Sequence, residues 1–93
     1  MLITASISLH STENRGRKSP IFFGYRPTFG MEKENSDCVI LTTTEQGIFP
    51  GKSAVVDIDI LHPHLLTNLK VGEAFKLLEG MKEIGTGIIL SDI

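Results

Sequence analysis

Cysteine, tryptophan and positive charge are scarce in this sequence, and two of these shortages limit what the protein can be. Cys38 is the single cysteine among the 93 residues, and tryptophan is absent. No disulfide can therefore form within the chain, and nothing indicates an oxidising compartment. We expect Cys38, which stands among apolar residues, to be a buried thiol. The formal net charge is −2, which argues against a dedicated, strongly basic nucleic-acid binder.

Long hydrophobic runs are also missing. No apolar stretch approaches the roughly 20 residues that a transmembrane helix needs. The first nine residues lack the basic start and the continuous apolar core of a signal peptide. Because the length is that of one domain, we expect residues 1–93 to form a single soluble, cytoplasmic domain without a membrane partner.

Alternation of apolar and polar residues is the main structural signal. It is clear at Leu2–Leu9 and at residues 53–61, and it predicts half-buried strands with Ile3, Ile7, Val56 and Ile58 inward. Between them we expect strands at residues 21–31 and 38–43, separated by a charged turn at residues 32–37. Later strands are expected at residues 71–79 and 82–90. Periodicity alone allows a helix at 71–79, but a hairpin turn at residues 79–82 favours a strand. This all-β pattern predicts a small closed antiparallel barrel or a sandwich.

Motifs for catalysis, nucleotide binding and metal binding are not found. No Gly-x-x-x-x-Gly-Lys-Ser/Thr phosphate loop occurs, so we expect no binding or hydrolysis of GTP. His10, His62 and His64 lack the spacing of a metal site, and we interpret Asp57 and Asp59 as a solubilising pair rather than acid–base groups. We predict a protein that is not an enzyme, with no catalytic residues, metal or cofactor.

Aromatic and basic residues are concentrated between residues 16 and 31. This stretch holds four of the six aromatic residues and three of the nine Lys and Arg residues. Such a combination is typical either of a core strand with a solvated edge or of a surface that binds phosphates and bases. A polar loop at residues 10–19 overlaps the start of this stretch, and its Arg15, Arg17 and Lys18 are candidates for phosphate contacts. The alternative is a solvated loop that keeps the domain soluble.

The same stretch resembles a known family. Residues 17–29, Arg-Lys-Ser-Pro-Ile-Phe-Phe-Gly-Tyr-Arg-Pro-Thr-Phe, are similar to the signature Gly-Arg-x-Thr-Pro-Phe-Phe-x-Gly-Tyr-Arg-Pro-Gln-Phe that opens the C-terminal, third domain of elongation factor Tu. Residues 49–51 resemble its Met-Pro-Gly turn, residues 61–63 its Ile-His/Lys-Pro, and residues 75–89 its closing segment. The resemblance covers nearly the whole chain and implies a closed six-stranded antiparallel β-barrel, here without the GTPase domain.

In that family the third domain contacts the T-stem backbone of transfer RNA. The resemblance carries this role onto Arg17 and Lys18, onto His62 before proline, and onto the turn at Glu79 and Gly80. Two positions depart from the family, since Thr28 replaces glutamine and Asp37 stands about where the family has threonine.

Two functions therefore remain open. The first is a non-catalytic module that binds transfer RNA or another structured RNA through its basic loop. The second is a protein-interaction module that docks a GTPase, another translation component or a copy of itself.

Overall fold

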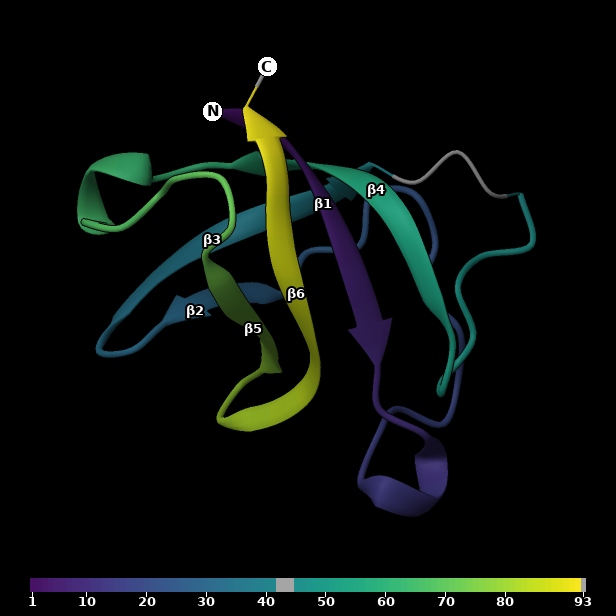
Figure 1. Ribbon diagram of the computed structural model, residues 1–93. Helices are drawn as coiled ribbons and strands as arrows, with labels where there is room; N and C mark the ends of the chain where they lie inside the picture. The colour runs from purple at the N-terminus through teal and green to yellow at the C-terminus, as the bar shows by residue number, and fades with distance from the viewer. Residues whose placement is uncertain (42–44, 93) are drawn as a thin grey trace.

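The fold is an all-β barrel, seen in a computed structural model that describes residues 1–41 and 45–92 (Figure 1). Six antiparallel strands close the barrel in the order β1-β4-β3-β2-β5-β6, which confirms the predicted fold class. The strands are β1 (Leu2–Leu9), β2 (Thr28–Met31), β3 (Glu34–Leu41), β4 (Ser53–Ile60), β5 (Ala74–Glu79) and β6 (Lys82–Asp92). Two short 3-10 turns, η1 (Thr12–Asn14) and η2 (Pro63–Leu65), lie in the connections. Among the described residues, no helix is long and apolar enough to span a membrane.

The register between β1 and β4 follows the alternation of the sequence. Ile3 pairs with Ile58 and Ala5 with Val56, so the apolar faces of both strands point into the barrel. Ile3, Ile7, Val56 and Ile58 are all buried, as predicted. A slip of one residue would bring the whole apolar set into water, which is why the pattern determines the register.

The centre of the barrel is an aromatic stack between β2 and β5. The rings of Phe29 and Phe75 lie with centroids 4.3 Å apart and planes at 22°, and both side chains are buried. Gly87 pairs with Phe75 across β5 and β6, and a Cβ atom there would overlap the Phe75 ring. Because Gly87 has no side chain, the Phe75 ring can pack in the core at this position.

The prediction of one aromatic strand over residues 21–31 is wrong in its first part. Only Thr28–Met31 forms a strand, while Ile21 makes a single bridge to Ile48. Between these lies a turn in which Tyr25 N–H donates to the Phe22 carbonyl (3.0 Å) and Gly24 has φ +90°. Pro20 and Pro27 have no backbone N–H to donate to a neighbouring strand, and the positive φ of Gly24 breaks the strand between them.

Two other predicted boundaries are corrected, and a third is not tested. Residues 34–37, expected in a turn, begin β3, because the hairpin needs only Glu32 and Lys33 for its turn. β5 begins at Ala74 rather than at Val71, since the residues before it form a turn. The expected end of the third strand at residues 42–43 lies outside the described residues.

Cys38 is fully buried in β3, as expected from its apolar neighbours. Its Sγ donates to the Pro27 carbonyl at 3.4 Å. Burial raises the pKa of Cys38 to about 12, and the carboxylates of Asp37 and Asp59 add to the shift. The thiol is therefore neutral across the physiological range.

Candidate functional site

The basic loop between β1 and β2 projects from one end of the barrel, as the purple coil at the lower right of Figure 1 shows. Its fold is local. Ser11 caps η1, with its carbonyl accepting from Gly16 N–H at 2.8 Å and its Oγ from Asn14 N–H at 3.2 Å. Thr12 Oγ1 donates to the Arg17 carbonyl at 2.7 Å. These bonds hold Arg15, Arg17 and their neighbour Lys18 close together.

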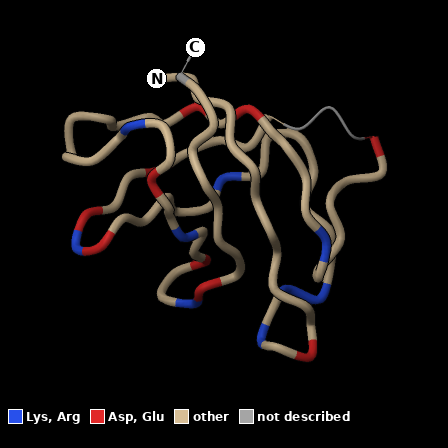
Figure 2. Tube along the Cα trace, in the orientation of Figure 1, with Lys and Arg blue, Asp and Glu red and all other residues tan. Residues whose placement is uncertain are grey.

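Two further elements meet this loop and bring more positive charge. The turn before β4 packs at the end of β1, where Leu9 N–H donates to the Lys52 carbonyl (2.9 Å). The β5–β6 hairpin reaches the loop through Lys82, whose Nζ lies 3.4 Å from the Gly16 carbonyl. In Figure 2 blue segments accordingly gather at the lower end of the barrel. Five of the nine Lys and Arg residues lie there, namely Arg15, Arg17, Lys18, Lys52 and Lys82; we call them the basic end.

Arg17 is held in place inside this end. Its guanidinium carbon lies 4.5 Å from the centroid of the Tyr25 ring, and its Nε is 3.6 Å from a carboxylate oxygen of Glu79. It also donates to the carbonyl of Ser19 at 3.3 Å and to its hydroxyl at 3.1 Å. Arg17 therefore acts first as a link between the loop and the hairpin, and Glu79 offsets its charge.

The other hairpin acid is neutralised as well. Glu83 lies 2.6 Å from His10 Nε2 and 3.4 Å from Lys76 Nζ. The hydrogen bond from His10, followed by the contact with Lys76, lowers the pKa of Glu83 below its usual range. By contrast, Arg15, Lys18 and Lys52 are exposed, and within the described residues none of them makes an ion pair. Lys82 is likewise exposed and makes no ion pair among these residues, so four cations of the basic end are free to meet an anion. Glu13 of the same loop is an exposed acid that makes no ion pair among these residues either.

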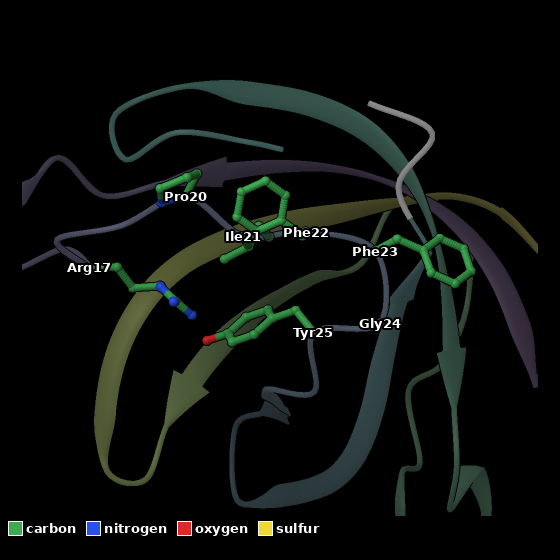
Figure 3. Close-up of a pocket in the computed structure, with 7 residues that line it drawn as sticks. All are labelled: Arg17, Pro20, Ile21, Phe22, Phe23, Gly24 and Tyr25. Atoms are coloured by element: carbon green, nitrogen blue, oxygen red, sulfur yellow. The ribbon is translucent and has the colours of Figure 1, made fainter. Parts of the chain in front are cut away.

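A shallow hollow of about 300 Å³ lies beside the basic end. Figure 3 shows it lined by Arg17 and by residues 20–25, with the Tyr25 ring beside Arg17, the Phe22 ring toward Pro20 and the Phe23 ring turned away. Phe22 is 50% exposed and Phe23 69% exposed. Part of the aromatic run is thus surface, whereas Phe29 belongs to the core.

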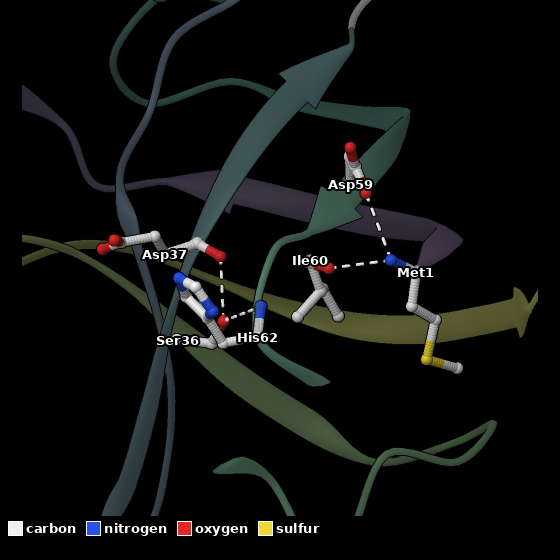
Figure 4. Close-up of polar contacts among 6 residues, drawn as sticks. All are labelled: Met1, Ser36, Asp37, Asp59, Ile60 and His62. Carbon is white, nitrogen blue, oxygen red and sulfur yellow. Dashed lines mark hydrogen bonds and ion pairs between the residues drawn. The ribbon is translucent and has the colours of Figure 1, made fainter. Parts of the chain in front are cut away.

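His62 does not join this site. It lies at the opposite end of the barrel, where its backbone N–H donates to the buried Ser36 hydroxyl at 3.0 Å (Figure 4). Ser36 in turn donates to the Asp37 carbonyl at 2.9 Å. β1 has 8 residues, so its length separates the two ends by about 25 Å. His62 lines a separate hollow with Asp37.

The remaining predicted residues are brought together. Glu79 and Gly80 lie beside the loop, Gly80 being the exposed start of the hairpin turn. Lys52 and Lys82 were missed by sequence reasoning, because only strand pairing brings them to residues 15–18. The described residues contain no group of three or more His, Cys, Asp or Glu placed to hold a metal ion.

Tyr25 gives a direct test of this geometry. Its hydroxyl is buried and has no hydrogen-bond partner among the described residues. Burial raises the pKa of Tyr25 to about 12; Arg17 offsets part of the shift and Glu79 adds to it. Since this is the one tyrosine and tryptophan is absent, the absorbance of the phenolate reports it alone. We expect ionisation only as the pH approaches 12, and near 10 in urea-unfolded protein.

The sign of the linkage follows from this shift. A folded pKa above the unfolded value means that the neutral phenol stabilises the fold fully below pH 10. The stabilisation is lost as the pH rises from 10 to about 12. A midpoint near 10 in the folded protein would show that the hydroxyl is hydrated, contrary to the structure.

No family model matches the chain, so the resemblance to elongation factor Tu rests on the sequence motifs alone.

Proposed function

We propose that this chain is a non-catalytic RNA-binding module that contacts the phosphate backbone through its basic end. The observation that carries the proposal is the meeting of three elements at this end. Its acidic neighbours Glu79 and Glu83 are paired within the fold, while Arg15, Lys18, Lys52 and Lys82 make no ion pair among the described residues and outnumber the one exposed acid of the loop, Glu13. Unpaired cations beside neutralised acids form a local positive surface on a chain whose net charge is −2.

The resemblance to the transfer RNA-contacting third domain of elongation factor Tu supports the same function. The set of contacts that we propose differs from the one carried over by resemblance. His62 is dropped because it lies at the far end, and Lys52 and Lys82 are added. Arg17 positions the loop through Glu79 rather than serving as the main phosphate ligand.

Salt dependence tests the proposal. About three neutralised phosphates give a slope of log affinity against log salt of roughly −2 to −3. Affinity for a short RNA hairpin duplex should therefore fall about 16- to 64-fold between about 50 and 200 mM salt. Replacing Arg15 and Lys18 by alanine should flatten the slope by about 1.8 units, because two phosphate contacts are lost. Fluorescence anisotropy with labelled RNA measures both quantities.

Lys33→Ala/Lys70→Ala is the matched control. It removes the same charge from two exposed lysines outside the basic end, so it should leave the slope almost unchanged. Binding that both double variants weaken equally would point to a general charge effect and contradict the proposal. If the protein does not bind RNA at low salt, the proposed function is wrong.

Docking of a protein is the second candidate, and one observation favours it. The outer faces of β4 and β6 expose apolar side chains, namely Val55, Ile88 and Leu90. Val55 and Ile88 both pair with Ser6 of β1, one from each side, so the two lie along one row of the sheet. A partner bound there would be insensitive to salt and to the variants of the basic end.

A further inference from the structure

We infer that the hollow beside the basic end takes an unstacked base, so that the RNA bound by this protein is single-stranded where it meets Phe22. This inference rests on the proposed function and names the class of RNA. It follows from the packing of the Phe22 ring, from the charge next to this ring and from the size of the hollow.

The Phe22 ring is a fixed platform. It covers Gly47, where an added Cβ atom would come within 2.9 Å of the ring carbons. The Cδ1–Cε1 edge of the ring thus packs on the backbone at Gly47, and Phe22 remains half exposed. The bridge between Ile21 and Ile48 holds the two segments together through N–H···O bonds of 2.9 and 2.8 Å. A half-exposed ring that is held along one edge loses little freedom when a base stacks on it.

Charge next to the platform selects a nucleotide over an apolar peptide. Arg17 forms the wall of the hollow toward the basic loop, and the adjacent Lys18 is exposed and makes no ion pair among the residues that the structure describes. A base on Phe22 would therefore have its phosphates within reach of this loop. Combining aromatic platforms with a track of cations is how proteins bind single strands.

The size of the hollow agrees with one planar group. Its volume of about 300 Å³ is at the lower limit of pockets for small molecules, and a protein partner of ordinary size would need to cover about 800 Å² of surface. The backbone N–H groups of Ile21, Gly24 and Tyr25 donate to carbonyls of the protein, so these three are not available to a base, and we infer that stacking on Phe22 is the main contact. We therefore expect little preference for base identity.

The experiment compares Phe22→Leu with Phe49→Leu. Both phenylalanines are 50% exposed, but Phe49 does not line the hollow. Labelled oligouridylate and an RNA hairpin duplex are titrated at low salt by fluorescence anisotropy. Phe22→Leu should weaken oligouridylate binding about tenfold, within the range for loss of one base–aromatic stack, and should leave duplex binding unchanged. Phe49→Leu should change neither.

Photocrosslinking of the wild-type protein gives a second measurement that does not depend on a variant. Oligouridylate that carries an iodo-substituted uridine should crosslink to the peptide containing Phe22. Equal effects of the two variants, or crosslinks only elsewhere, would overturn the inference while duplex binding upholds the proposed function. If wild-type protein binds neither RNA at low salt, the proposed function fails and this inference with it.

Discussion

Replacing Phe29 by alanine is expected to remove about 3–5 kcal/mol of stability, the range for truncating a buried phenylalanine. Phe29 is fully buried and stacks on Phe75 with ring centroids 4.3 Å apart. The loss of its ring leaves a cavity at the centre of the barrel, which closed strands cannot collapse to fill. A domain of this size has a total stability of roughly 5–14 kcal/mol, so the variant should be close to unfolding. Urea unfolding followed by circular dichroism measures the change.

Phe49→Ala makes the same chemical change on the surface. Because Phe49 is 50% exposed, its truncation should alter the free energy of unfolding by no more than about 1 kcal/mol. The difference between the two variants gives the contribution of burying Phe29, its stack on Phe75 included. Similar losses in both would mean that the barrel is not closed around Phe29.

Much of the barrel follows from local pattern. Alternation in β1 and β4 assigns an inner and an outer face to every residue, and the buried face is the apolar one. The hairpin between β5 and β6 has a two-residue turn that begins at Gly80, as the position of this glycine in the sequence indicates. Such features depend on neighbours in the chain, which is why the sequence alone predicts them.

The segment at residues 21–27 could not be predicted in the same way. Its apolar run is typical of a strand, yet Phe22 and Phe23 are exposed. Their placement is decided by partners distant in sequence: Ile21 bonds to Ile48, and Gly24 N–H donates to the Ile40 carbonyl at 2.8 Å. Tertiary contacts of this kind override local pattern.

The candidate site shows the same limit. Residues 15–18 were found because they are adjacent in sequence, but the pair of Arg17 and Glu79 joins residues far apart in the chain. Lys52 and Lys82 carried no sequence signal, since each is an isolated lysine beside a turn. Resemblance gave His62 the same RNA-contacting role as Arg17 and Lys18, whereas the course of β4 carries it to the end of the barrel opposite the loop.

Gly47→Ala is expected to destabilise the fold by about 2–5 kcal/mol. Gly47 has φ +80°, a conformation that costs about 1–2 kcal/mol for a residue with a Cβ atom. The added carbon would also lie 2.6 Å from the Ile21 carbonyl oxygen and 2.9 Å from the Phe22 ring. Because the first of these contacts is backbone, relief requires the bridge to open, and overpacking of this kind typically costs a further 1–3 kcal/mol. Urea unfolding measures the sum.

Gly24→Ala separates strain from overlap. Gly24 has φ +90°, yet an added Cβ would meet nothing within 4 Å. This control should lose only the conformational part, about 1–2 kcal/mol, so Gly47→Ala should exceed it by the cost of overlap. At temperatures where it remains folded, Gly47→Ala should also displace the Phe22 ring and weaken binding of oligouridylate. Equal losses of stability in the two variants would mean that the Phe22 ring is not packed on Gly47, and the aromatic platform would then lose its rigid support.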